Sequence, residues 1–440
     1  MKLDHELFAV TGMPVLHSLS PYLFRAGFDA LGLQNQYLRL SARSASDALV
    51  VASQMKMRGV NVTSPYKEQM ARLVECHDEA SKTLQAVNTL VRDEDGWLGY
   101  NTDPQGVVGA LRHHGFEISG ARVLVLGAGG AGRAAAYGLV DSGARVSIVN
   151  RTAEKARLWA DRLGCDQVDL DDMENSIQDA DLLVSCLPGG VQLFDPKILN
   201  PSLLVLEADY SQGWLSRCAS DAGCEIIDGR QWLIHQALAG FSIMVRRKVS
   251  LSGLMGSAPP SKNTLNNVIL IGFMGSGKSS VGRVLARELE VDFTDTDDVV
   301  ERRAGMSIDG IFQSRGEADF RTMEHNVLGD VLRRGPQVVA CGGGAILLEQ
   351  NRELVESAGI VVWLWAPLDE CLQRAAVGTR PLLKGAFLKG HGVDIQARKL
   401  FEMRLPLYAG CSDLVVPSLG PDPKEISRIV AHEIRCIWKN

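Results

Sequence analysis

Residues Arg122–Thr152 have the sequence RVLVLGAGGAGRAAAYGLVDSGARVSIVNRT, and this stretch decides the fold of the first half of the chain. Its apolar run Val123–Leu126 predicts a strand, and the alanine-rich run after the glycines predicts a helix. Between them, Gly127 permits a tight turn, Gly129 permits close approach of a pyrophosphate, and Gly132 permits close packing of helix on strand. A strand, a G-x-G-x-x-G turn and a helix in this order predict a dinucleotide-binding unit.

The residues at the end of the next predicted strand indicate which dinucleotide binds. An NAD-specific protein usually places a carboxylate here to hold the ribose 2′-hydroxyl, whereas this chain has Asn150-Arg151-Thr152. A planar guanidinium suits a 2′-phosphate, so the sequence favours NADP(H) over NAD. The residues assigned to the cofactor on these grounds are Gly127, Ala128, Gly129, Gly130, Ala131, Gly132, Asn150, Arg151 and Thr152.

Outward from this stretch, strands and amphipathic helices alternate on both sides, which predicts an α/β fold with parallel sheets. Residues 246–265 contain Gly, Ser, Pro-Pro and Asn without a sustained period, and we interpret them as a linker. We therefore expect an α/β substrate domain over 1–118, completed by about 231–245, a Rossmann-like NADP domain over 119–230, and a P-loop α/β/α domain over 266–440.

A second glycine loop opens the C-terminal part. Residues Gly272–Ser279 have the sequence GFMGSGKS, which satisfies G-x-x-x-x-G-K-[ST] after the predicted strand VILIGF. In such a loop the backbone amides cradle phosphates, Lys278 reaches the β- and γ-phosphates, and the Ser279 hydroxyl binds Mg²⁺. The residues assigned to ATP are Gly275, Ser276, Gly277, Lys278, Ser279 and Ser280.

Composition excludes several other classes of protein. The 440 residues carry 46 Lys+Arg and 52 Asp+Glu, a net charge of −6 that gives no general attraction to nucleic acid or anionic lipid. No apolar run reaches the ~18 residues of a membrane helix, and the first ten residues do not suggest a signal peptide. Nine scattered cysteines, an odd number, favour free thiols over a disulfide framework. We expect a cytoplasmic protein with small-molecule substrates, and leave its oligomeric state open.

Polar strings interrupt the apolar sequence before the first glycine loop: HSLSP from His17, NVTSPYK from Asn61, AVNT from Ala86 and NTD from Asn101. Their neutral donors and acceptors suit a polyhydroxylated ligand. Lys67 supplies a movable proton, and Asp103 can orient or balance it. Each string alone could be a turn or a helix cap, but together, ahead of a dinucleotide fold, they predict a substrate pocket.

The first half of the chain resembles shikimate dehydrogenase over about residues 5 to 245. The resemblance rests on GMPVLHSLSP, GVNVTSPYKE, LQAVNTLV, GYNTDPQG, GAGGAGRA, NRT and DGRQWLIHQAL, in this order. It implies reversible NADPH-dependent reduction of 3-dehydroshikimate to shikimate, with Lys67 as the acid/base and Asp103 beside it. It also implies that Ser18 and Ser20 hold the substrate carboxylate while His17 is structural. Further residues implied by the resemblance are Thr63, Asn88, Asp103 and Gln236 at the ring hydroxyls, Tyr210 at the substrate and Gly229 near the nicotinamide.

Acidic and basic residues narrow the choice among P-loop proteins. Asp295 and Asp297 alternate in FTDTD, and on a strand they would share one face. One carboxylate is expected to serve Mg²⁺ through water and the other a substrate hydroxyl. A small anionic substrate together with a triphosphate also requires several guanidinium groups, and the chain offers Arg321, Arg380 and Arg404, as well as a glycine run, Gly342–Gly344.

These motifs resemble shikimate kinase over about residues 266 to 418. The resemblance implies transfer of the ATP γ-phosphoryl group to the shikimate 3-hydroxyl. It implies that Arg321 and Arg404 clamp the shikimate carboxylate, that Gly343 contacts shikimate, and that Asp297 orients or deprotonates the hydroxyl. Arg380 belongs to a lid over ATP, about residues 376 to 392, and Asp295 then remains for Mg²⁺. The product of the first half would be the substrate of the second, so we expect a bifunctional enzyme.

Two segments depart from the dehydrogenase pattern, SCLPGG at 185–190 and SQGWL at 211–215, and they are expected to affect NADP binding and domain closure more than chemistry. Two alternatives therefore stay open for the first half. It could prefer quinate with NAD, or it could be a binding module fused to an active kinase. Retention of Lys67, Asp103 and the glycine turn argues against the binding module, and NRT argues against NAD.

Overall fold

The computed structural model describes residues 5–187, 190–209, 213–255, 267–376, 395–420 and 422–438. The chain forms two compact units, each built from separate stretches of sequence. Unit 1 comprises Met1–Pro21, Asn35–Met57 and Pro259–Asn440, and unit 2 comprises Tyr22–Gln34 and Arg58–Ala258. Among the described residues, none of the helices combines the length and apolar character needed to cross a membrane.

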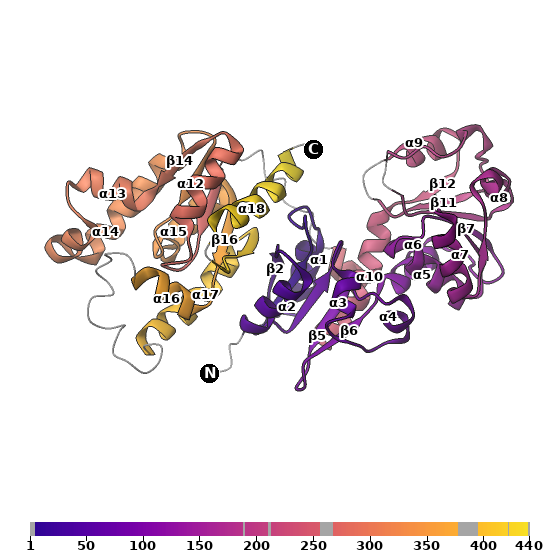
Figure 1. Ribbon diagram of the computed structural model, residues 1–440, viewed down its shortest axis with the longest axis horizontal. Helices are drawn as coiled ribbons and strands as arrows, with labels where there is room; N and C mark the ends of the chain where they lie inside the picture. Colours follow the sequence, from indigo (N-terminus) through magenta and orange to yellow (C-terminus); the bar gives the residue numbers. More distant parts are fainter. Residues whose placement is uncertain are drawn as a thin grey trace. The chain divides into compact units, whose positions relative to one another are not determined.

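Unit 2 contains a six-stranded, fully parallel sheet that matches the predicted Rossmann-like domain (Figure 1). The strands lie in the order β12-β11-β10-β7-β8-β9, the doubly wound order of dinucleotide-binding folds. Their bounds are β7 (Arg122–Leu126), β8 (Arg145–Val149), β9 (Asp166–Gln167), β10 (Leu182–Ser185), β11 (Leu204–Glu207) and β12 (Glu225–Ile227). The accompanying helices are α5 (Asp103–His114), α6 (Gly130–Asp141), α7 (Ala153–Leu163), α8 (Met173–Asp179) and α9 (Trp214–Asp221).

Buried apolar residues cover both faces of this sheet, as the residues of its central strand β7 show. Val123 and Val125 of β7 belong to one buried cluster, and Leu124 and Leu126 belong to the cluster on the opposite face. A strand buried on both faces needs a continuous apolar run rather than an alternating one, and RVLVL supplies it.

A second, mixed run of strands in unit 2 follows the order β3-β5-β6-β4. The sequence predicted parallel sheets throughout, and this was wrong here: β3 and β6 both run antiparallel to β5. For β5 and β6 the physical reason is a hairpin, in which Asp93 N–H donates to Gly96 O (2.8 Å) and Gly96 has a φ of 145°. The bounds are β3 (Gly59–Val62), β4 (Glu75–Cys76), β5 (Thr89–Arg92) and β6 (Trp97–Tyr100), with short helices α3 (Lys67–Ala71) and α4 (Glu79–Leu84).

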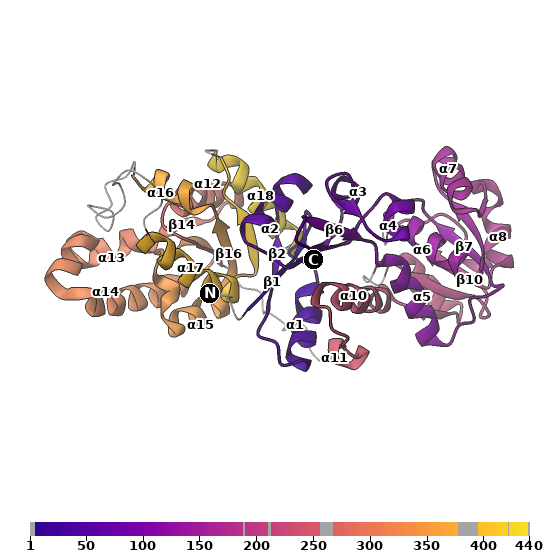
Figure 2. The ribbon, with the colours of Figure 1, turned by 90° about the horizontal axis from the view of Figure 1, so that it is seen from below.

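Three helices from distant parts of the sequence pack together: α1 (Ser20–Ala30), which belongs to unit 2 from Tyr22 onward, α10 (Gly229–Val245) and α11 (Leu251–Met255) (Figure 2). Phe24 of α1 lies 5.3 Å from Phe241 of α10, measured between ring centroids. Helix α11 falls inside the predicted linker 246–265, and its Leu254 is fully buried near Gly27. Residues 256–266 lie outside the described residues.

Unit 1 is built on a parallel run of strands in the order β14-β15-β13-β16-β17-β2-β1. Their bounds are β1 (Leu7–Thr11), β2 (Gln36–Leu40), β13 (Asn267–Ile271), β14 (Asp292–Asp295), β15 (Gln337–Ala340), β16 (Gly359–Trp365) and β17 (Leu414–Pro417). The helices are α2 (Ala45–Gln54), α12 (Lys278–Leu289), α13 (Thr296–Ala304), α14 (Ile308–Leu332), α15 (Glu349–Ala358), α16 (Leu368–Ala376), α17 (Ile395–Cys411) and α18 (Pro423–Trp438). Helices α12 and α18 pack against each other.

Within unit 1, the two N-terminal strands join the C-terminal ones directly. β2 pairs with β17 at Leu40 and Val415, and Ser41 N–H donates to Val415 O (3.0 Å). The sequence analysis assigns residues 1–118 to one substrate domain, whereas Asn35–Met57 group here with the C-terminal residues. The three-domain division stays a prediction.

Candidate active sites

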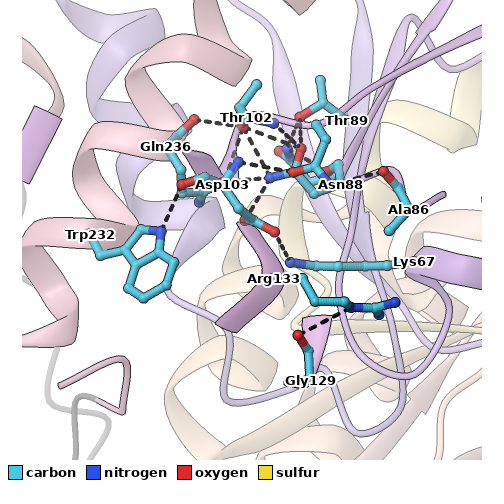
Figure 3. Close-up of polar contacts among 12 residues, drawn as sticks. Lys67, Ala86, Asn88, Thr89, Thr102, Asp103, Gly129, Arg133, Trp232 and Gln236 are labelled. Carbon is cyan, nitrogen blue, oxygen red and sulfur yellow. Dashed lines mark hydrogen bonds and ion pairs between the residues drawn. The ribbon is translucent and has the colours of Figure 1, made fainter. Parts of the chain in front are cut away.

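The predicted acid/base pair forms an ion pair in unit 2. Lys67 is the first residue of α3 and Asp103 is the first residue of α5, which begins Asp103-Pro104 as helix starts commonly do. Lys67 Nζ lies 2.5 Å from Asp103 Oδ2, and the two side chains are 24% and 11% exposed (Figure 3). An ammonium held by a carboxylate at a partly open position can exchange a proton with a bound ligand.

Asn88 fixes the carboxylate of this pair from behind (Figure 3). Its Nδ2 donates to Asp103 Oδ1 (2.8 Å) and also faces Thr102 Oγ1 (3.0 Å) and Gln236 Oε1 (3.2 Å). Its Oδ1 accepts from Thr102 N–H (2.9 Å), so the amide is held at both ends and is buried. The predicted residues Lys67, Asn88, Asp103 and Gln236 are thus brought together in one hydrogen-bonded group.

Sequence reasoning missed two members of this group. Thr102 Oγ1 donates to Gln236 O (3.1 Å), and Trp232 Nε1 donates to Asp103 O (3.0 Å). Thr102 stands next to Asp103 in NTD, and Trp232 precedes Gln236 by four residues, which places both on one face of a helix. That spacing was the signal available for Trp232, which we interpreted from the sequence as a packing residue.

Arg133, also missed, ties the helix of Lys67 to the glycine loop. Its guanidinium pairs with Glu68, the neighbour of Lys67, and its Nε donates to Gly129 O (3.2 Å) (Figure 3). The guanidinium also lies 4.4 Å from the centroid of the Trp159 ring, and the residue is buried. Lys67 is therefore anchored beside the loop that is predicted to bind the dinucleotide.

The glycine loop has the geometry that its sequence predicts. Gly127 has a φ of 102°, and a Cβ on Gly132 would lie 1.7 Å from Gly127 O, so no side chain fits at Gly132. Gly129 caps α6, and no atom lies within 4 Å of where its Cβ would be. An open helix N-terminus of this kind presents backbone N–H groups to an anion.

The residues that follow β8 lie at the edge of this loop. Asn150 Oδ1 accepts from Ala128 N–H (3.1 Å), and its Nδ2 donates to Thr152 O (3.0 Å). Arg151 and Thr152 are exposed. Gly229 starts α10, where a Cβ would lie 2.4 Å from Ala208 O. Tyr210 lies outside the described residues, as do 188–189 and 211–212 of the two departing segments.

Ser18 and Ser20 belong to unit 1, and Thr63 belongs to unit 2. The hydroxyls of Ser18 and Ser20 are 3.3 Å apart, and the guanidinium of Arg39 donates to Ser18 O (2.8 and 3.2 Å). His17 is exposed and Ser20 is buried. Thr63 is half-buried, and its carbonyl accepts from Tyr66 N–H (3.0 Å).

The second glycine loop lies in unit 1 between β13 and α12. Lys278 is buried, and its Nζ donates to Gly272 O (2.9 Å) and Phe273 O (3.0 Å). A Cβ on Gly275 would lie 2.0 Å from Cys371 O, so the loop backbone packs directly on α16. Among the described atoms the buried Ser276 hydroxyl has no hydrogen-bond partner. A lysine folded back over its own loop can turn to a phosphate when one binds.

The residues predicted for a metal meet beside this loop. Ser279 Oγ donates to Asp295 Oδ2 (2.6 Å), and Asp295 Oδ1 caps α13 by accepting from Asp297 N–H (3.1 Å). A hydroxyl and a carboxylate are the hard oxygen ligands that suit Mg²⁺, so the donor set fits this ion. The strand argument for Asp297 was wrong, since β14 ends at Asp295 and Asp297 lies in the first turn of α13.

Acidic and basic groups gather around Gly342–Gly344, the loop after β15. A Cβ on Gly342 would lie 2.6 Å from Asp297 Oδ1 and 2.8 Å from Glu324 Oε1, and one on Gly344 would lie 2.8 Å from the Arg321 guanidinium. Arg404 and Tyr408 of α17 both donate to Gly343 O, at 3.0 and 2.7 Å. The structure thus brings Asp297, Arg321, Gly343 and Arg404 together, as predicted from the sequence.

Glu324 was not predicted, although it holds Arg321 in place. Arg321 Nη1 donates to Glu324 Oε2 (2.7 Å), and Glu324 is buried. Burial raises the pKa of Glu324, and the cation of Arg321 opposes that rise. The i, i+3 spacing in FRTME was the available signal. The kink at Gly316, with a φ of 83°, starts the segment of α14 that carries both residues.

Arg380 and the predicted lid from 377 onward lie outside the described residues.

A Lys–Asp pair beside a dinucleotide loop in one unit and a P-loop facing acidic and basic groups in the other define an oxidoreductase joined to a kinase. Residues 10–90 match the family model "shikimate dehydrogenase substrate binding domain", 110–198 match "shikimate / quinate 5-dehydrogenase", and 274–435 match "shikimate kinase". The chain belongs to the shikimate dehydrogenase family and continues into a shikimate kinase domain, which confirms both resemblances.

Individual relatives match the dehydrogenase half of the chain. A shikimate dehydrogenase (NADP(+)) of Syntrophobacter fumaroxidans is 36% identical over 254 residues, which cover 56% of this chain and 88% of the relative. The shikimate 5-dehydrogenase of Thermus thermophilus, solved with NADP(H) and shikimate, is 28% identical with a TM-score of 0.53 and covers 57% of this chain and 97% of that one. The quinate dehydrogenase of Corynebacterium glutamicum, solved with NAD, is 28% identical with a TM-score of 0.53, covering 58% and 98%.

Proposed function

We propose that this chain reduces 3-dehydroshikimate to shikimate with NADPH and then phosphorylates shikimate at its 3-hydroxyl with ATP. The observation that carries the first step is the Lys67–Asp103 pair, anchored through Glu68 and Arg133 beside the glycine loop. The second step is supported by the P-loop and by the group formed by Asp297, Arg321, Glu324 and Arg404.

In the first reaction the glycine loop and Asn150–Thr152 would hold NADPH, which would supply a hydride to the carbonyl carbon. The carbonyl oxygen gains negative charge, and the Lys67 ammonium stabilises it and gives it a proton. Asp103 is held by Asn88, which also contacts Gln236, and it keeps that ammonium oriented. Following the family pattern, Ser18 and Ser20 take the substrate carboxylate, Thr63 and Asn88 take ring hydroxyls, Tyr210 contacts the substrate, and Gly229 lies near the nicotinamide.

In the second reaction the residues of unit 1 position two anions and one hydroxyl. Lys278 and the backbone of Gly275–Ser280 hold the ATP phosphates, and Ser279 with Asp295 would hold Mg²⁺, which neutralises phosphate charge when bound. Arg321 and Arg404 clamp the shikimate carboxylate beside Gly343, and Asp297 orients the attacking hydroxyl. Arg380 would meet the charge that develops on the transferred phosphoryl group.

Replacing Arg151 with Asp is expected to raise the KM for NADPH at least about tenfold while changing the KM for NADH less than about twofold. The reason is that a carboxylate repels the 2′-phosphate that only NADPH carries. Steady-state rates with each cofactor measure both constants. Arg157→Asp, a charge reversal at an exposed arginine of the following helix α7, is the matched control. Equal changes for the two cofactors would remove Arg151 from this role.

A direct assay tests the proposal as a whole. The purified full chain is given NADP⁺ and shikimate without ATP, and NADPH absorbance is followed. A second assay supplies ATP, Mg²⁺ and shikimate and follows ADP. We expect activity in both. Because a quinate dehydrogenase is among the similar structures, the first assay is repeated with quinate and NAD. A higher kcat/KM with that pair would mean that the first half prefers quinate to shikimate. No reduction of either cofactor with any substrate would favour a binding module.

A further inference from the structure

A buried carboxylate near the end of the described chain contacts residues near its beginning. Glu433 of α18 is fully buried within unit 1. Its Oε2 accepts from Val15 N–H (2.9 Å) and Leu16 N–H (2.8 Å), and its Oε1 accepts from the Ser41 hydroxyl (2.6 Å) and lies 3.0 Å from Val15 N. A carboxylate without water needs such donors, and here two come from consecutive backbone amides.

The contacted backbone leads directly into the serines predicted to hold the substrate carboxylate. Val15 O accepts from Ser18 N–H (3.0 Å), so Val15 is bonded to Glu433 on one side and to Ser18 on the other. Ser20 N–H in turn donates to Ser18 Oγ (3.3 Å). The turn Val15–Ser18 therefore has its first two amides fixed by a side chain from the kinase domain.

Further contacts hold helix α18, which carries Glu433, in place. β17 pairs with β2 at Val415 and Leu40, immediately before Ser41, and α18 packs on both β17 and α12. Arg43 Nη1 forms an ion pair with Glu425 at the start of α18 (3.0 Å), and Gln36 Nε2 donates to Pro406 O (3.1 Å). Helix α18 is thus held mainly by its packing on β17, the strand that pairs with β2, whereas the Arg43–Glu425 pair is exposed and contributes little.

We propose that Glu433 is a positioning residue for the dehydrogenase reaction: from the last helix of the kinase domain it fixes the turn that presents Ser18 and Ser20 to the substrate carboxylate. This inference rests on the proposed function of those serines. It makes recognition of shikimate by the dehydrogenase half depend on a residue of the kinase half, which a separate dehydrogenase would lack.

The test uses Glu433→Gln in the full chain. Glutamine keeps the size of the side chain, but its NH₂ group must face one of the three donors, so one hydrogen bond is lost. We expect the KM for shikimate in NADP⁺ reduction to rise about tenfold, the loss of one buried hydrogen bond. The kcat and the KM for NADP⁺ should change less than about twofold, and shikimate phosphorylation by the same preparation should be unchanged.

A second substrate distinguishes a specific effect on the position of Ser18 and Ser20 from a general destabilisation of the fold. Methyl shikimate lacks the carboxylate charge, so Ser18 and Ser20 gain little from it. The ratio of kcat/KM for shikimate to that for methyl shikimate should fall in Glu433→Gln by the same factor of about ten. Glu425→Gln is the matched control, because this residue lies on the same helix, is 49% exposed and contacts Arg43 rather than the turn. It should leave every constant unchanged.

Two outcomes would overturn the proposal: an unchanged KM for shikimate in Glu433→Gln, or equal losses of kcat in both activities with an unchanged methyl-ester ratio. If Glu433→Gln does not fold, Ser41→Ala decides. It removes one donor from the carboxylate and should raise the KM about threefold, and no change would overturn the proposal. Failure of the proposed function itself looks different, because the wild-type chain would then not reduce NADP⁺ with shikimate at all.

Discussion

Lys67→Ala is expected to lower the turnover of NADP⁺-dependent shikimate oxidation at least about a hundredfold, the lower range for loss of a positioned acid/base. The methyl side chain cannot hold or move the proton of the reacting oxygen, and it leaves no cation to stabilise negative charge there. Initial rates at saturating substrate measure the effect. Phosphorylation of shikimate by the same preparation should stay within about twofold, which gives an internal test of folding.

Loss of fold is not the expected cause of this effect. The Asp103 carboxylate keeps its bond from Asn88 Nδ2 (2.8 Å) when Lys67 is removed, and the Asp103 carbonyl keeps its bond from Trp232. Lys82→Ala is the matched control: Lys82 also pairs with a carboxylate, Glu79 (3.1 Å), but it is 51% exposed and stands outside the polar group. Turnover of Lys67→Ala close to that of Lys82→Ala would exclude Lys67 as the acid/base.

The parts of the fold that could be predicted from sequence are those set by neighbouring residues. Each glycine loop directly joins a strand to a helix, so its type follows from local sterics: a Cβ on Gly132 would meet Gly127 O, and Gly277 has a φ of 92°. The hairpin at Asp93–Gly96 was equally local, and its Asp-Gly turn signal was available, but the alternation of strands and helices outweighed it.

The parts that could not be predicted depend on contacts between distant residues. Arg133 meets Glu68 across 65 positions, and Glu433 meets Val15 across 418. No periodicity carries such information, because a buried arginine and an exposed one look the same in sequence. At Asp297 only the predicted end of a strand was wrong. We extended the strand two residues too far, so Asp297 was selected correctly although it lies on a helix and not on a strand.

Lys278→Ala is expected to lower the turnover of shikimate phosphorylation by about a hundredfold to a thousandfold, the range for loss of one preorganised group at developing charge. Lys278 is buried, and its ammonium is held by two carbonyls of its own loop, Gly272 O and Phe273 O. This places the cation next to the loop that is proposed to bind the phosphates, and alanine removes it. Rates of ADP release at saturating ATP and shikimate measure the effect.

The two activities of one chain sharpen this last test. In Lys278→Ala the NADP⁺-dependent oxidation of shikimate should be unchanged, since its Lys67–Asp103 pair lies in unit 2 and the P-loop lies in unit 1. Lys424→Ala, at an exposed lysine of the same unit, should change neither activity. A Lys278→Ala chain that phosphorylates shikimate at the rate of Lys424→Ala would mean that the P-loop does not carry the phosphoryl transfer. Loss of both activities together would instead show that Lys278 supports folding.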